Sequence, residues 1–128
     1  HGGTFNANPV TMAAGYAAME MMTPEAFLRI NSLGQAFRNA ITDVLEQMNL
    51  QANVLGQASV FAIDIIDPRI GNKNLKRGAL RQIEGIEADF INAGYFLSAG
   101  LHGTVSTAMD ENDIDPFCDT LKSILKTM

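Results

Sequence analysis

The sequence predicts an α+β fold in which a long helix is followed by a small, mostly antiparallel sheet that helices cover. Apolar residues recur every three or four positions between residues 27 and 48, which is the spacing of one helix face. Short apolar runs around a glycine follow at 54–65 and are typical of strands. Helical spacing returns at 80–91 and again at 114–125, so helices and strands share the chain.

Length and composition indicate one folded domain, or one part of a larger one. The chain has 128 residues, of which 47% are apolar and 18% are charged, whereas disordered chains are poor in apolar residues and dense in charge. Its net charge is -5 and it has no basic run, so nucleic acid is not an expected partner. Its one cysteine, Cys118, excludes an internal disulfide and a zinc site built from cysteines.

Targeting signals are not evident in the sequence. No apolar stretch reaches the roughly 20 residues that a membrane-spanning helix needs. The N-terminus carries neither an initiator Met nor the basic region of a signal peptide. We therefore expect a cytoplasmic protein without a membrane segment, in which His1 is not the first residue translated.

The first predicted helix has no polar face. Asn8 followed by Pro9 is typical of a helix start, and the helix extends to about Met22 with Glu20 as its one charged residue. A helix that is apolar on every side must be covered on every side. The chain has few elements to spare for this, so we expect a missing partner, which is another domain or another subunit.

The second predicted helix is long and amphipathic. Residues 23–25, Thr-Pro-Glu, favour a helix start with an acid in the first turn, and the apolar pattern ends near Asn49. Gly34 lies within this helix, where glycine costs about 1 kcal/mol relative to alanine. We therefore expect another element to approach the helix closely at Gly34.

The remaining elements follow in order along the chain. Two strands are predicted at Val54-Leu55 and Val60–Ile65, and the continuous apolar run of the second predicts burial on both faces. Residues 67–78 favour a loop, and the helix that follows at Leu80–Ile91 ends at a glycine signal over residues 92–94. Further strands are predicted at Tyr95–Leu97 and Thr104–Ser106.

The last predicted helix begins at an Asp110 cap. Its apolar positions form one stripe, which includes Cys118, so we expect the cysteine in the core. The acids at 110, 111, 113 and 115 lack the spacing of a calcium-binding loop and instead suit the positive end of the helix dipole. Neither His1 nor His102 has an acid cluster nearby, so no metal site and no complete catalytic set are expected.

The glycine-rich start of the chain is the exception. Gly2 and Gly3 precede Thr4 and then the helix start at Asn8. Free N–H groups, a hydroxyl donor and the absence of bulky side chains are the parts of an anion site. On the residues alone, this is a candidate phosphate contact.

Residues 1–15, HGGTFNANPVTMAAG, closely resemble the segment that follows the cofactor lysine in class-III pyridoxal-phosphate-dependent aminotransferases. Residues 92–97 and 105–115 resemble the late strand, turn and helix cap of the same family, so the likeness extends over the whole chain in order. Within the family, the branch of glutamate-1-semialdehyde 2,1-aminomutases and their aminotransferase relatives is the most similar.

The resemblance implies the C-terminal part of a fold-type-I enzyme that transfers an amino group through aldimines of pyridoxal 5'-phosphate. Residues 1–22 would form the phosphate-contact loop and a helix that packs on the missing large domain, and residues 23–128 would form the C-terminal small domain. Gly3 and Thr4 match the residues that bind the cofactor phosphate of the neighbouring subunit, which implies a homodimer. A small-molecule amino donor and acceptor would be the substrates.

The cofactor lysine of this family lies upstream of the matched segment. None of Lys73, Lys76, Lys122 and Lys126 stands in its expected context, so the resemblance implies no catalytic residue in this chain and an inactive fragment. The alternative is a non-catalytic interaction module that docks on a partner through the apolar helix. In either case the exposed apolar helix predicts self-association of the isolated chain.

Overall fold

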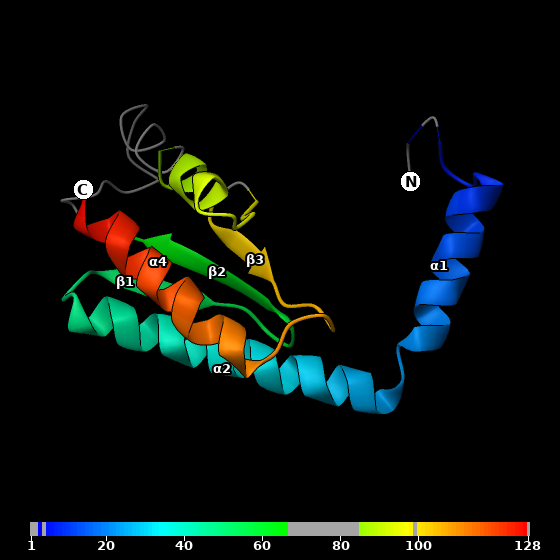
Figure 1. Ribbon diagram of the computed structural model, residues 1–128, viewed down its shortest axis with the longest axis horizontal. Helices are drawn as coiled ribbons and strands as arrows, with labels where there is room; N and C mark the ends of the chain where they lie inside the picture. Colours follow the sequence, from blue (N-terminus) through cyan, green and yellow to red (C-terminus); the bar gives the residue numbers. More distant parts are fainter. Residues whose placement is uncertain (1–2, 4, 67–84, 99, 128) are drawn as a thin grey trace.

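The computed structural model describes residues 3, 5–66, 85–98 and 100–127. Two helices come first, α1 (Pro9–Met21) and α2 (Pro24–Gln47), followed by the strands β1 (Ala52–Leu55) and β2 (Val60–Ile65). Residues 85–92 are helical, and β3 (His102–Thr104), the 3₁₀ turn η1 (Glu111–Asp113) and α4 (Ile114–Lys126) complete the chain. The α+β prediction is therefore confirmed (Figure 1).

Both N-terminal helices begin where the sequence predicts. The Asn8 side chain accepts hydrogen bonds from the N–H groups of Val10 and Thr11, and Pro9 occupies the first helical position. Thr23 caps α2 in the same way by accepting from the N–H of Ala26. A polar cap followed by proline is therefore sufficient to start each helix.

α1 stands apart from the rest of the described fold (Figure 1). None of its residues is buried, and the apolar side chains of Val10, Tyr16 and Met19 are 78%, 67% and 68% exposed. The expectation of an apolar helix that the rest of the described chain leaves uncovered is therefore confirmed.

The described part of the chain contains no helix that is long and apolar enough to cross a membrane.

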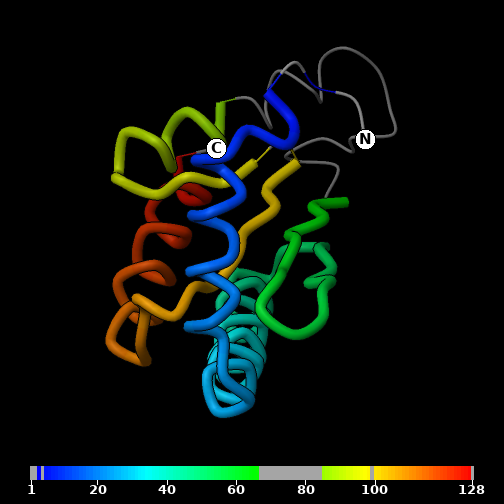
Figure 2. The backbone as a smooth tube through the Cα atoms, turned by 90° about the vertical axis from the view of Figure 1, so that its right-hand side faces the viewer, coloured from blue at the N-terminus to red at the C-terminus, as the bar shows by residue number. Residues whose placement is uncertain are grey.

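The three strands form one antiparallel sheet with β2 in the centre. Phe61, Ile63 and Ile65 on β2 are buried, but Val60 is 46% exposed and the alternate positions are at most half-buried. The prediction that this strand is buried on both faces is therefore wrong. The described helices cover only one face of the sheet, so in the described part of the chain the other face of this apolar run is open (Figure 2).

The β1–β2 turn packs closely on α2. A Cβ added at Gly34 would lie 2.2 Å from the carbonyl oxygen of Ala58, which confirms the close approach expected at this glycine. One turn further along α2, Arg38 is 9% exposed and donates hydrogen bonds to the carbonyl oxygens of Ala58 and Val60. A glycine and a buried arginine on the same helix face thus hold the hairpin.

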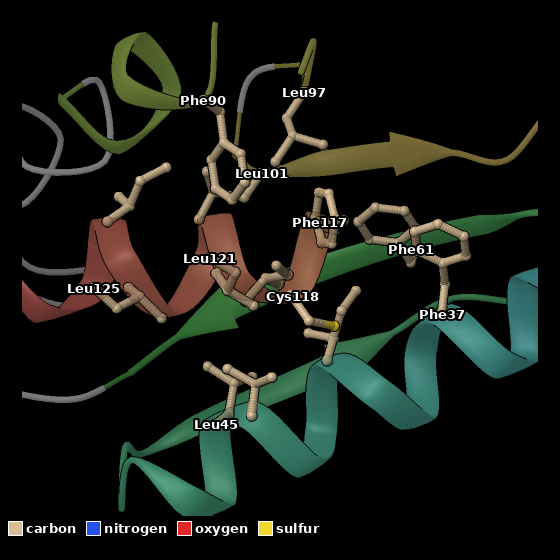
Figure 3. Close-up of a cluster of buried hydrophobic side chains, with 14 of the residues drawn as sticks. Phe37, Leu45, Phe61, Phe90, Leu97, Leu101, Phe117, Cys118, Leu121 and Leu125 are labelled. Atoms are coloured by element: carbon tan, nitrogen blue, oxygen red, sulfur yellow. The ribbon is translucent and has the colours of Figure 1, made fainter. Parts of the chain in front are cut away.

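An aromatic cluster centred on Phe117 joins the layers (Figure 3). The Phe117 ring lies 5.8 Å from Phe37 on α2, 5.7 Å from Phe61 on β2, 5.4 Å from Phe90 and 5.3 Å from Tyr95, measured between centroids. Three of these contacts are edge-on and the contact with Phe90 is stacked, both of which are favourable ring geometries. One side chain of α4 therefore ties α2, the sheet and the 85–92 helix into a single core.

The segment after the 85–92 helix differs from the prediction. Gly94 has φ +90, which agrees with the expected glycine stop, but Tyr95–Leu97 is not a strand. The chain reverses at Gly100 and Leu101, both with positive φ, so the segment pairs with β3 only through one bridge between Ser98 and His102. A strand needs a longer run of partners than this reversal leaves.

The strand expected at Thr104–Ser106 lies two residues earlier, at His102–Thr104, because pairing begins directly after Leu101. The final helix is as predicted, with Asp110 at its start and the Cys118 side chain buried. The predicted loop over 67–78 and the residues Leu80 and Ile83 lie outside the described residues.

Candidate functional site

The loop before α1 is folded by its own main chain. The carbonyl oxygen of Gly3 accepts a hydrogen bond from the N–H of Asn6 at 3.2 Å, and that of Phe5 accepts from Asn8 at 3.3 Å. Ala7 between them has φ 60. Two consecutive turns therefore bring the chain from Gly3 to the helix cap, and Thr4 lies outside the described residues.

The first turn of α1 is capped by Asn8, as the Asn8-Pro9 pair predicts. The Asn8 side-chain oxygen lies 2.9 Å from the backbone nitrogen of Val10 and 3.4 Å from that of Thr11. These N–H groups are ones that an anion would otherwise take at a helix N-terminus. An anion would therefore have to bind to the loop before Asn8, which is where the sequence places the candidate phosphate contact.

The loop around Gly3 is open to solvent. A Cβ at Gly3 would lie 3.0 Å from the side-chain oxygen of Asn6, an exposed side chain that can move aside. Gly3 and Phe5 are both exposed, and no carboxylate precedes Glu20 in the sequence. The loop is thus accessible and free of negative charge, which suits contact with a phosphate group brought by another molecule.

The other candidate residues have structural roles or none. His102 is exposed on the edge strand β3. Asp110 and Asp113 form a reciprocal capping box, with Asp110 accepting from the N–H of Asn112 and Asp113 accepting from that of Asp110. Across residues 3, 5–66, 85–98 and 100–127, no cluster of three His, Cys, Asp or Glu side chains could hold a metal ion.

The structure also places the cysteine and two of the four lysines that the sequence singles out. Burial raises the pKa of the Cys118 thiol, so the cysteine is a core residue rather than a nucleophile. Lys122 is half-buried and Lys126 is exposed, both on α4, whereas Lys73 and Lys76 lie outside the described residues.

The structure also contains an apolar cavity that the sequence does not indicate. It has a volume of about 170 Å³ and opens beside Phe96, which is 82% exposed. Gly103 shapes it, because a Cβ there would lie 2.2 Å from the Phe61 ring. The cavity is lined by Phe37, Phe61, Gly94, Tyr95, Phe96, Leu97, Gly103, Thr104, Met109 and Phe117. Such a lining can hold an apolar group but offers no carboxylate, histidine or lysine for catalysis.

Comparison with known proteins identifies the family. No family model matches the chain. The chain is 34% identical over 97% of its length to a glutamate-1-semialdehyde 2,1-aminomutase from Methanothrix thermoacetophila, of which it covers 29%. An omega-transaminase from Sphaerobacter thermophilus superposes on it with a TM-score of 0.80 and 34% identity, over 98% of this chain and 30% of that one.

A second solved structure agrees. A transaminase with PLP bound superposes with a TM-score of 0.76 and 25% identity, over 99% of this chain and 29% of that one. The chain therefore spans about 30% of the length of the relatives that it matches. Because the likeness in sequence and in fold extends over nearly all of its residues, the chain belongs to the family of pyridoxal-phosphate-dependent class-III aminotransferases and aminomutases and corresponds to the C-terminal part of these enzymes.

Proposed function

We propose that the chain is the C-terminal part of an enzyme that transfers an amino group with pyridoxal 5'-phosphate, as an aminotransferase or a glutamate-1-semialdehyde-type aminomutase. The observation that carries this proposal is the match, over almost the entire chain, to an aminomutase in sequence and to an omega-transaminase in fold. When bound, the cofactor supplies an electron sink at the carbon that bears the amino group.

Within that enzyme, the loop at Gly3 and Thr4 holds the cofactor phosphate of the neighbouring subunit. The Thr4 hydroxyl and N–H would donate hydrogen bonds to the phosphate, and Gly3 would leave the loop free of a side chain beside it. The exposed position of Gly3 and the absence of a carboxylate before Glu20 support this assignment. The active unit is accordingly a homodimer in the cytoplasm, with a small-molecule amino donor and acceptor as substrates.

The two parts of the chain have different roles in this proposal. Residues 1–22 form the phosphate loop and a helix that packs on the large domain, and residues 23–128 form the small domain. The complete exposure of the apolar α1 side chains supports a covering partner. The chain by itself does not transfer amino groups, because the lysine that forms the Schiff base lies in the upstream part.

Substitution of Thr4 tests the phosphate contact. In the longer protein that includes the residues preceding His1, Thr4→Val removes a hydroxyl that donates to a charged phosphate, which is worth about 1.5–3 kcal/mol and weakens cofactor binding by roughly 10- to 100-fold. The measurement is the absorbance of protein-bound cofactor after dialysis against decreasing cofactor concentrations.

Thr107→Val is the matched control, because Thr107 is exposed in the turn before η1 and lies outside the N-terminal loop. It should leave cofactor retention unchanged. Equal retention by Thr4→Val and the parent protein would contradict the phosphate contact. If neither the parent protein nor any variant binds cofactor, and the protein instead binds a protein partner through α1, the alternative of an interaction module is favoured.

A further inference from the structure

The apolar cavity lies where two segments of the fold separate. The segment after the 85–92 helix pairs with β3 through the bridge between Ser98 and His102. The next pair in that antiparallel register would be Phe96 with Thr104, but Phe96 is not part of a strand. Both Phe96 and Thr104 line the cavity, which therefore lies between two segments that diverge from the bridge.

The cavity leads from an exposed rim to buried aromatic rings. Phe37, Phe61 and Phe117 line it and are at most 5% exposed, and their ring centroids lie 6.2, 5.8 and 5.7 Å apart (Figure 3). Phe96 and Thr104 also line it, and both are exposed. A molecule can therefore enter at the rim and reach the core rings.

Two sets of contacts fix the walls of the cavity. The Phe61 ring rests against Gly103, where an added Cβ would lie 2.2 Å from the ring, so the ring cannot move further towards β3. Arg29 of α2 donates hydrogen bonds to the main-chain oxygens of Thr107, at 2.9 Å, and Met109, at 2.6 Å. These bonds hold the turn that carries Met109, which is another lining residue. The cavity is thus formed before any ligand binds, as is usual for small-molecule sites.

The size and lining of the cavity suit one apolar ring. Its volume is about 170 Å³, and an apolar cavity of about 150 Å³ in another protein binds benzene. Five of its ten lining residues are aromatic and none is charged. Aromatic walls hold a further ring in edge-on or offset-stacked contact. Water gains little there, because a buried water molecule needs several polar partners.

We propose that this cavity is a binding site for a neutral molecule, or part of one, that consists of a single aromatic ring. The Phe96 ring does not fill the site itself, because it is 82% exposed. Neither Gly3 nor Thr4 lines the cavity, so the inference does not rest on the proposed function.

Methyl NMR with benzene as the probe tests the proposal. In the longer protein that includes the residues preceding His1, the methionine methyl groups are labelled with carbon-13 and assigned by single Met→Leu substitutions. A bound ring shifts the signal of Met109, which lines the cavity, whereas Met12 and Met19 on α1 are internal controls outside it. We expect the Met109 signal to reach a saturating shift while the two controls stay in place. No shift at Met109, or equal shifts at all three, would overturn the proposal.

Filling the cavity gives a second test. Leu97 is a buried lining residue, so Leu97→Phe places a ring of the protein in the space and should weaken benzene binding at least tenfold. Ile91→Phe is the matched control, because Ile91 is 54% exposed and is not a lining residue, and it should leave the affinity unchanged. Thr104→Phe narrows the exposed rim and replaces Leu97→Phe should that variant fail to fold. Unchanged affinity in a folded filling variant would contradict the site.

Naphthalene separates a site for one ring from a surface that adsorbs any apolar molecule. Two fused rings exceed the volume that one ring fills, so naphthalene should bind at least tenfold more weakly than benzene at Met109. Equal binding of both molecules would overturn the single-ring site. A protein that retains cofactor but binds no benzene would overturn this inference and leave the proposed function standing.

Discussion

α1 and α2 begin alike and end in opposite environments. Each starts at a polar cap followed by proline, and the cap side chain accepts hydrogen bonds from the first turn in both helices. Eight residues of α2 are buried against the sheet and α4, whereas no residue of α1 is buried. The difference lies in the residues beyond the first turn, since α2 alternates polar and apolar faces and α1 is apolar on every side.

Where a helix begins and how much of its surface needs a partner are set by different parts of its sequence. Capping residues decide where a helix begins, and they do so from local sequence alone. The pattern of apolar residues decides how much of the helix surface needs a partner. α2 finds its partner within the chain, whereas α1 has a surface suited to a partner that the described residues do not supply.

The largest contrast is expected between a core ring and a ring on α1. Phe117 is 3% exposed and contacts rings from three other parts of the fold, so Phe117→Ala should lower the free energy of unfolding by about 3–5 kcal/mol. Tyr16 is 67% exposed, so Tyr16→Ala should change the free energy of unfolding of the isolated chain by less than about 0.5 kcal/mol. Urea unfolding followed by circular dichroism measures both.

Equal losses from the two substitutions would break the contrast, because they would mean that α1 is packed in the isolated chain, against its own fold or against a second copy. In the longer protein the outcome for Tyr16→Ala should differ. There a covering domain makes the same ring part of an interface, and the cost of its removal rises.

Glycine replacements sharpen the contrast at the backbone. Gly34→Ala on α2 places a Cβ 2.2 Å from the carbonyl oxygen of Ala58, so the hairpin must shift, and we expect a loss of about 1–3 kcal/mol. Gly15→Ala on α1 meets nothing within 4 Å and gains helix propensity, which is worth about 1 kcal/mol to the local helix. Unfolding in urea reports the first change, and amide hydrogen exchange along α1 reports the second.

Gly34→Ala is expected to lower stability and Gly15→Ala to raise the stability of the local helix, and this opposite direction is what the two measurements test. A stabilising Gly34→Ala would show that the β1–β2 turn does not rest on α2 as described. A destabilising Gly15→Ala would show that α1 already has a close neighbour in the isolated chain.

The sequence predicts the helices of this fold better than its strands. Helix starts depend on neighbouring residues, so Asn8, Thr23 and Asp110 could each be identified from the chain alone. Strand position depends on where the chain reverses, and Leu101 with φ 60 is a reversal that no propensity indicates. The segment at Tyr95–Leu97 has the residues of a strand but pairs with no strand in the described part of the chain.

Only part of the candidate site could be predicted from the sequence. The family motif at Gly3 and Thr4 depends on residue identities in order, which the sequence contains. The turns that bring the chain from Gly3 to Asn8 depend on main-chain geometry, including the φ of 60 at Ala7, and the sequence does not contain it. The apolar cavity is lined by segments far apart in the chain, from Phe37 to Phe117, and only their packing brings them together.

The smallest expected effect lies at the junction of the two helices. Glu25 is in the first turn of α2, whereas α1 has no acid in its first turn. A hydrogen bond from the backbone, and then one from the Thr23 side chain, lower the pKa of the Glu25 carboxyl. Both bonds favour the ionised form, so Glu25 should titrate at lower pH in the folded chain than in the chain unfolded by urea.

The sign of the pH dependence follows from this direction. Because the folded pKa lies below the unfolded one, the contribution of Glu25 to stability is present above the unfolded pKa and is lost as the pH falls through the folded pKa. Carbon-detected NMR titration of the Glu25 carboxyl measures the shift directly, and Thr23→Val should move the pKa part of the way back, since the backbone bond remains. An unchanged pKa in Thr23→Val would show that the Thr23 hydroxyl does not reach Glu25 and that the backbone bond alone lowers the pKa of this carboxyl.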